Sequence, residues 1–224
     1  MVTPVAPGDG LVTETARIQT ALLLAAGVGS RLGDSPDAMP KCLVEVGGLT
    51  LLQRMILALR AQGITRLVIV VGFRQELIRE AAAALAGDMQ IDFLVSEDFA
   101  RTNNIVSLWL ARGHLAEPFL LLESDLVFDP RLLAGMMVPD RAAVSSLATW
   151  MQGTRVSLGE YDSVQSFLFP PFADSENQFK TVNIYSLSRP AWEQIGDCLE
   201  RCVSSGRVDV YYEHVFAELL EAGA

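Results

Sequence analysis

The segment between residues 21 and 41 constrains the fold of this chain more than any other. The apolar run 21–26 leads straight into Gly27-Val28-Gly29-Ser30-Arg31, and Pro40-Lys41 follows, with Lys41 ten residues after Arg31. Two glycines allow backbone N–H groups to approach an anion closely, and the Arg and Lys side chains can reach its oxygens. The segment therefore predicts a strand followed by a phosphate-binding loop.

The spacing of the glycines excludes two better-known phosphate loops. The P-loop string G-x-x-x-x-G-K-[ST] does not occur in this chain. The dinucleotide fingerprint G-x-G-x-x-G could begin at Gly27, but the third glycine, Gly33, comes one position late. A different kind of phosphate-binding loop is therefore expected.

The segment resembles the signature of the nucleotidyltransferases that make nucleotide-activated sugars and alcohols. That signature reads roughly G-x-G-[ST]-R-L and, after a variable loop, P-K-x-L-x-x-V; the matching residues are Gly27, Gly29, Ser30, Arg31, Leu32, Pro40, Lys41, Leu43 and Val46. The resemblance implies that Arg31 and Lys41 are catalytic and hold the triphosphate. It also implies a nucleotide-binding loop made of Ala25, Ala26, Gly27, Gly29 and Ser30. The sugar-1-phosphate branch usually continues with P-L-T, whereas Gly33-Asp34-Ser35 stands here, which disfavours a sugar acceptor.

Strand and helix patterns alternate through the first part of the chain. Apolar runs predict strands, and apolar residues at helical spacing predict helices; the strands are 20–25, 67–71, 91–95 and 119–123, and the helices are 50–62, 75–85 and 103–112. This alternation predicts an α/β fold with a Rossmann-like, mostly parallel sheet and helices on both faces. The resemblance implies the nucleotide-diphospho-sugar transferase type of this fold. Ligands of such sheets bind at the carboxyl ends of the strands.

The pattern changes after Pro139 to closely spaced strands followed by helices. The predicted strands are 143–150, 154–158, 164–169 and 179–185, and the predicted helices are 188–204 and 209–221. Residues 1–18 are predicted to form a flexible arm. Residues 19–224 are predicted to form one domain, with a nucleotide-binding half (19–139) and a smaller, mixed acceptor-binding half (140–224).

Composition excludes several classes of protein. Half of the 224 residues are apolar, which indicates a globular chain, and a net charge of −10 argues against a nucleic-acid partner. The apolar runs are too short to cross a bilayer, and residues 1–10 lack the features of a secretory signal, so we expect a cytoplasmic protein with no membrane insertion. Two histidines and no G-x-S-x-G string disfavour a His-rich zinc site and a serine hydrolase.

A carboxylate pair follows the strand 119–122. Glu123-Ser124-Asp125 is predicted to lie at the ligand-binding edge of the sheet, and carboxylates are the oxygen donors that Mg²⁺ prefers. Alternatively, Asp125 caps the turn before Pro130. In the resembling family such an Asp binds the metal that bridges the nucleotide phosphates. Asp125 is therefore the first candidate for a Mg²⁺ ligand, with Asp129 and Glu123 as weaker ones.

A tandem Asn pair begins the predicted helix 103–112. Asn103 is a good helix N-cap, which is one interpretation. The string Asn103-Asn104-Ile105-Val106-Ser107-Leu108 also resembles the branch of the family that contains the phosphocholine cytidylyltransferases and the related enzymes of 2-aminoethylphosphonate. A side-chain amide both donates and accepts, which suits cytosine. We therefore assign Asn103 and Asn104 to the base or ribose of CTP.

Two strings in the second half are candidates for binding the acceptor. Lys180 would bind a phosphate or phosphonate and Asn183 would orient it, unless Lys180 is an ordinary exposed lysine. The string Asp209-Val210-Tyr211-Tyr212-Glu213 resembles the same branch. Asp209 and Glu213, four apart on a predicted helix, would share a face and, with Tyr211, enclose an amine. The alternative is a helix N-cap at Asp209 followed by packed aromatics.

One departure from the family concerns the metal site. Family members usually continue past the last helix into an acidic E-x-D segment, whereas this sequence ends at Gly223-Ala224. We therefore expect either a truncated chain or a second metal carboxylate from elsewhere, with Asp209 as the candidate.

These observations predict a Mg²⁺-dependent cytidylyltransferase. It would transfer CMP from CTP to a small anionic acceptor such as phosphocholine, phosphoethanolamine or 2-aminoethylphosphonate. A sugar-1-phosphate or inositol-phosphate nucleotidylyltransferase and a non-catalytic nucleotide-binding regulatory domain are the alternatives. A second copy of the chain, in a homodimer, is left open as a further partner.

Overall fold

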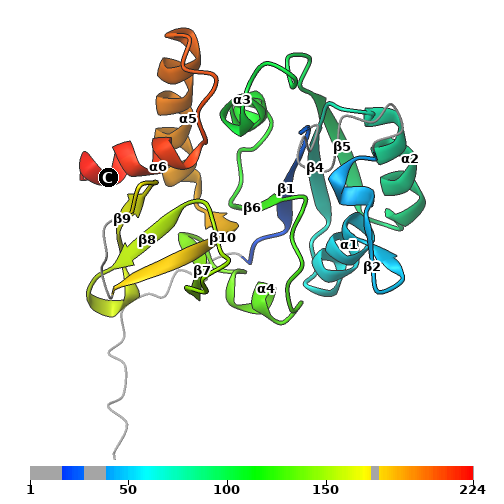
Figure 1. Ribbon diagram of the computed structural model, residues 1–224. Helices are drawn as coiled ribbons and strands as arrows, with labels where there is room; N and C mark the ends of the chain where they lie inside the picture. The colour runs from blue at the N-terminus through cyan, green and yellow to red at the C-terminus, as the bar shows by residue number, and fades with distance from the viewer. Residues whose placement is uncertain (1–16, 28–38, 173–176, 224) are drawn as a thin grey trace, which may run out of the picture.

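The computed structural model describes residues 17–27, 39–172 and 177–223 (Figure 1). The predictions that concern Gly29, Ser30 and Arg31 lie outside these residues. None of the described helices is both long and apolar enough to cross a membrane.

One eight-stranded sheet organises the chain, in the order β5-β4-β1-β6-β10-β8-β9, with β7 also paired to β10. Four strands are parallel: β1 (Thr20–Ala25), β4 (Arg66–Val71), β5 (Gln90–Val95) and β6 (Phe119–Glu123). The antiparallel extension consists of β10 (Gln178–Leu187), β7 (Arg141–Ser146), β8 (Arg155–Leu158) and β9 (Val164–Leu168). The predicted fold class, a mostly parallel sheet joined to a smaller mixed part, is confirmed.

Helices cover both faces of the sheet (Figure 1). The α-helices of the described residues are α1 (Leu51–Ala61), α2 (Gln75–Leu85), α3 (Asn104–Leu110), α4 (Leu132–Gly135), α5 (Arg189–Ser204) and α6 (Glu213–Glu221). Short elements complete the described part: the 3-10 turns η2 (Lys41–Leu43), η3 (Ala111–Gly113) and η4 (Glu160–Asp162), and the hairpin of β2 (Glu45–Val46) and β3 (Leu49–Thr50).

The central strand β1 shows why the sheet is buried on both sides. All six of its residues are buried, which is typical of a parallel strand between two helical layers. Successive side chains of a strand point to opposite faces. Leu23 therefore packs into the core beneath α1 and α2, whereas Leu22 and Leu24 pack into the core beneath α3 and α5.

The structure corrects three boundaries. Helix α6 begins at Glu213, four residues later than predicted, and β7 ends at Ser146 rather than at residue 150. Ile18, which the sequence pattern assigns to the arm, is only 1% exposed and belongs to the core. The hairpin β2–β3 and the single turn α4 are not predicted from sequence, because they are too short to show a period.

Arg66 connects the parallel strands near their amino ends. Its guanidinium donates to Asp92 Oδ2 (2.8 Å) and to Glu117 Oε1 (3.0 Å), and Thr20 Oγ1 donates to the same Glu117 oxygen (2.7 Å). Partial burial would raise the pKa of Glu117, but the hydrogen bonds from Thr20 and Arg66 hold it below its usual value. Folding therefore favours the charged carboxylate.

We expect Glu117→Gln to lower the free energy of unfolding by about 1 kcal/mol at pH 7, because this carboxylate is only partly screened from water. A folded-state pKa below the unfolded one stabilises the fold above the unfolded pKa, and this contribution is lost as the pH falls through the folded pKa. The difference in the free energy of unfolding between the variant and the wild type should therefore decrease below about pH 4. Urea denaturation at pH 7 and at pH 3.5 measures this difference, and Glu80→Gln, at an exposed position, is the control. The same difference at both pH values would contradict the expectation.

Candidate active site

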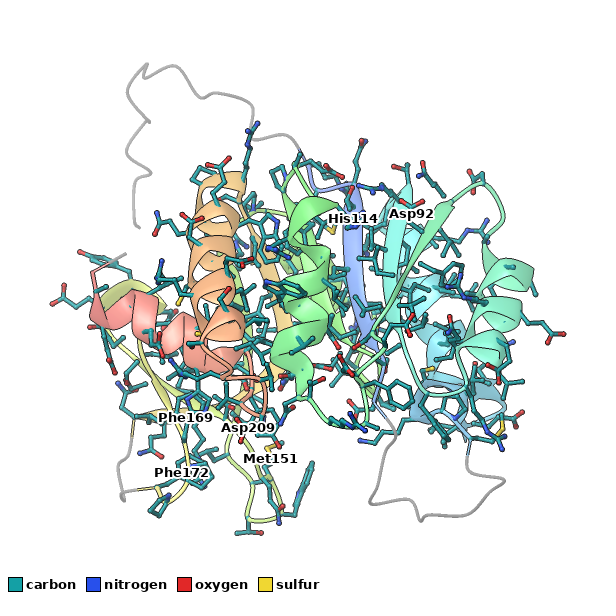
Figure 2. All side chains as sticks on the ribbon, turned by 90° about the horizontal axis from the view of Figure 1, so that it is seen from above. Asp92, His114, Met151, Phe169, Phe172 and Asp209 are labelled. Carbon is teal, nitrogen blue, oxygen red and sulfur yellow. The ribbon has the colours of Figure 1, made fainter. Side chains whose placement is uncertain are left out.

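A cleft of about 940 Å³ opens at the carboxyl ends of β1 and β6 and extends over the antiparallel part of the sheet. Both halves of the chain line it; among the predicted site residues these are Ala26, Gly27, Lys41, Asn103, Asn104, Asp125, Lys180, Asn183, Tyr211 and Glu213. Figure 2 shows its rim residues Met151, Phe169 and Phe172 at one end of the molecule, opposite Asp92 and His114. Ala25, inside β1, is buried and only 7% exposed.

Lys41 and Asp125 form an ion pair in this cleft, with 3.1 Å between Nζ and Oδ2. Lys41 begins η2, which is anchored by the buried Cys42, and Asp125 lies two residues beyond β6. Their side chains are 34% and 44% exposed, so both remain open to a ligand. The two candidates that stand 84 positions apart in the sequence therefore share one site.

Three carboxyl groups line the cleft: those of Glu123, Asp125 and Glu213. Burial, followed by the charges of Glu213 and Asp125, raises the pKa of Glu123 to about 8. Burial also raises the pKa of Glu213. Carboxylate oxygens are the donors that Mg²⁺ prefers, and the charge of a cation would relieve the repulsion among these groups. Asp125 and Glu123 stay the candidate ligands for such an ion.

The two Asn side chains are bonded within the protein. Asn103 caps α3 by accepting from the Asn104 N–H (2.8 Å), and its Nδ2 donates to the Asp209 carbonyl (3.3 Å). Asn104 donates through Nδ2 to Glu123 Oε1 (3.0 Å) and accepts through Oδ1 from the Tyr212 N–H (3.0 Å). Asn104 therefore connects the end of β6 to the start of α6. The assignment of both residues to the base or ribose of CTP stays a prediction.

We expect Asn104→Ala to lower the free energy of unfolding by about 2–3 kcal/mol, because it leaves a buried backbone N–H and a carboxylate oxygen without partners. Asn103→Ala is the matched control. It removes an N-cap and a weaker bond, at about 1 kcal/mol. Urea denaturation of both variants measures the difference, and equal losses would show that Asn104 does not hold the two elements together.

An irregularity in β10 positions the second group of predicted residues. The register of the β10–β7 pair shifts between Thr181 and Tyr185, and Asn183 within this bulge has a φ of +56°. Asn adopts this left-handed backbone more readily than most residues. Its Nδ2 donates to Glu213 Oε1 (3.0 Å), and Glu213 is only 2% exposed. Within the described residues the other Glu213 oxygen has no hydrogen-bond partner.

The structure corrects the prediction for Asp209. Asp209 precedes α6 instead of lying on it, so it does not share a helical face with Glu213. It is also absent from the residues that line the cleft, whereas Tyr211, which is 49% exposed, lines it. The segment 210–212 approaches the cleft without regular structure, because Asn104, from a distant part of the chain, holds the Tyr212 backbone.

Several cleft residues are not predicted from the sequence. Phe99, Met151, Arg155, Phe169 and Phe172 line the cleft but lie in loops or in a short strand with no motif. Met151 and Phe169 lie on loops on either side of β8 and β9, and only the pairing of the strands brings these loops together.

An α/β sheet whose parallel strands end at a cleft that holds a lysine–aspartate pair fits a nucleotidyltransferase. The sequence pattern of the MobA-like NTP transferase domain matches residues 21–156. The chain therefore belongs to this family of nucleotidyltransferases.

Several known proteins are similar to this chain in sequence or in fold. CMP-5'-(3-aminopropyl)phosphonate synthase of Streptomyces rubellomurinus is 33% identical over 222 residues, which cover 91% of this chain and 34% of the relative. Choline-phosphate cytidylyltransferase of Streptococcus pneumoniae is 30% identical over 48% of this chain and 45% of its own length. This chain thus spans about a third to a half of these two relatives. The structure of the inositol-1-phosphate CTP transferase of T. maritima superposes with a TM-score of 0.72 at 19% identity, covering 93% and 83% of the two chains.

Proposed function

We propose that this protein is a Mg²⁺-dependent cytidylyltransferase that transfers CMP from CTP to a small phosphate- or phosphonate-bearing amino-alcohol and releases pyrophosphate. One observation carries the proposal. The Lys41–Asp125 pair and the buried Glu213, with its unpartnered oxygen, line the same cleft. A cation and a carboxylate that could bind a metal suit a triphosphate. A buried carboxylate with one unpartnered oxygen, in the same cleft as Lys180, suits a zwitterionic acceptor. Two relatives named for CMP transfer to a phosphonate and to choline phosphate support it.

In the proposed reaction an acceptor phosphonate or phosphate oxygen attacks the α-phosphorus of CTP. The bond from this phosphorus to its bridging oxygen breaks, and pyrophosphate leaves with the electron pair. Lys41 donates to the triphosphate and offsets the charge that develops on it. Gly27 allows close approach of the nucleotide, and Arg31 is proposed to assist. Mg²⁺, held by Asp125 and Glu123, would supply further charge neutralisation between the phosphates.

The acceptor is proposed to bind along β10 and the segment before α6. Lys180 would bind its anionic group, and Glu213, oriented by Asn183, its ammonium group. The exposed face of Tyr211 would add a cation–π contact of about 0.5–2 kcal/mol. An inositol phosphate or sugar phosphate has no cation to pair with Glu213. This chemistry favours the amino-alcohol over the sugar and inositol alternatives.

Pyrophosphate release tests the proposal. The protein is incubated with CTP, Mg²⁺ and, in separate reactions, 2-aminoethylphosphonate, phosphoethanolamine, phosphocholine, inositol phosphate and glucose 1-phosphate. We expect release with one or more of the three amines and background release with the other two. Tight CTP binding without turnover of any acceptor would support the regulatory-domain alternative. Cytoplasmic location and a homodimer stay predictions from the sequence.

A further inference from the structure

Arg155 and Lys180 stand directly opposite one another on β8 and β10. They are register partners in this antiparallel pair, and both line the cleft. Opposite residues on neighbouring antiparallel strands share one face of the sheet, with Cβ atoms about 4.5–5.5 Å apart. Two like charges in this arrangement destabilise the pair. This wall of the cleft therefore carries two positive charges at a fixed place, and Glu213 acts on that of Lys180.

Within the part of the chain that the structure describes, Arg155 contacts an aromatic ring and a neutral amide. Its guanidinium stacks on the ring of Phe172, with Cζ 3.8 Å from the centroid, and Nη1 donates to the neutral amide of Gln178 (3.0 Å). Among residues 17–27, 39–172 and 177–223, no carboxylate pairs with Arg155, whereas Lys41 in the same cleft is paired with Asp125. An arginine has five N–H donors, so several remain for a ligand.

The neighbouring backbone fixes the position of the pair. The Thr154 carbonyl accepts from the Thr181 N–H (3.3 Å) and from Thr181 Oγ1 (3.1 Å), which joins the start of β8 to β10 beside Lys180. Gly153 turns the chain with a φ of +89°, and a Cβ built there would stand 3.7 Å from Lys180 Nζ. Burial lowers the pKa of Lys180, and the charge of Glu213 counteracts this effect.

We propose that Arg155 and Lys180 together form a seat for the doubly charged phosphonate or phosphate group of the acceptor. Arg155 presents a planar fork to two of its oxygens, and Lys180 adds a point charge. The ligand would relieve the repulsion between the two cations. This inference rests on the proposed function and extends it, because it makes Arg155 a determinant of acceptor binding.

Arg155→Gln tests this inference. We expect the KM for the acceptor to rise about 10- to 100-fold while the KM for CTP changes less than about twofold. Arg155→Lys should recover part of the loss, because a charge remains without the fork. Running 2-aminoethylphosphonate and phosphoethanolamine in parallel shows whether the seat serves a phosphonate, a phosphate ester or both. Equal changes in the two KM values, or no change in either value, would overturn the inference.

Arg79→Gln is a matched control. Arg79 also stacks on a phenylalanine, with Cζ 4.6 Å from the Phe93 centroid, and also donates to a neutral amide, that of Gln75 (3.1 Å). It lies on α2, outside the residues that line the cleft. We expect this variant to keep the wild-type KM for the acceptor. A similar rise in both variants would mean that the stacking acts only on the fold, which contradicts the seat.

A binding measurement separates this inference from the proposed function. Inorganic phosphate is titrated by calorimetry into wild type and Arg155→Gln, each saturated with a non-hydrolysable CTP analogue. Weaker phosphate binding in the variant supports the seat even if no acceptor is turned over. Equal binding overturns the seat even if the wild type is an active cytidylyltransferase.

Discussion

Lys41→Ala is expected to reduce turnover by about 10²–10³-fold, because we propose that Lys41 donates to the charge that develops on the triphosphate in the transition state. Its Nζ is 3.1 Å from Asp125 and 34% exposed, so the truncation opens no buried cavity. The circular dichroism spectrum and the urea midpoint should therefore stay close to those of the wild type. Turnover is measured by pyrophosphate release with saturating CTP and acceptor.

Lys41→Arg shows whether the compact ammonium group of Lys41 matters in addition to its positive charge. An arginine keeps the positive charge but not the compact ammonium, and we expect it to recover only part of the rate. Near-normal turnover of Lys41→Ala would remove Lys41 from the mechanism. Unfolding of Lys41→Ala would instead assign Lys41 a structural role.

Asp125→Asn is expected to reduce turnover about as much as Lys41→Ala, but it should also change the dependence of the rate on Mg²⁺. The neutral amide is a poorer ligand for a hard cation, so turnover should fall by about 10²–10³-fold and the Mg²⁺ concentration for half-maximal rate should rise. A Mg²⁺ titration of the rate measures both. Asp129→Asn is the matched control, because Asp129 is ion-paired with Arg131 and does not line the cleft. A larger effect from Asp129→Asn would move the metal site away from Asp125.

The double variant Lys41→Ala/Asp125→Asn tests whether the pair acts as a unit. Residues in contact rarely have additive effects. We expect the double variant to lose less activity than the product of the two single losses, because each single change already leaves its partner unpaired. Strict additivity would mean that the two side chains act independently.

The parallel core could be predicted from sequence because its signals are local. Strand β1, helix α2 and strand β6 have the bounds that their apolar patterns predict. A central parallel strand is apolar along its whole length, and the apolar residues of an amphipathic helix recur with the period of the helical turn. The proximity of Lys41 and Asp125 follows from the rule that ligands bind at the carboxyl ends of such strands.

The rest of the site depends on contacts between distant residues. Helix α6 begins late because its start has no side-chain cap and Asn104, 108 positions away, binds the Tyr212 backbone. Arg155 becomes a candidate only through its register with Lys180. The order of β7, β8 and β10 determines that register, and no local pattern encodes it.

The central claim is that the protein transfers CMP from CTP to a small acceptor in this cleft. The most direct measurement is ³¹P nuclear magnetic resonance of a reaction that contains CTP, Mg²⁺ and 2-aminoethylphosphonate, followed by the same reaction with UTP, dTTP or GTP. The account predicts a new phosphonate–phosphate anhydride signal and an equal amount of pyrophosphate, with CTP preferred over the other nucleotides. Preference for UTP, dTTP or GTP, or pyrophosphate without the conjugate, would contradict it.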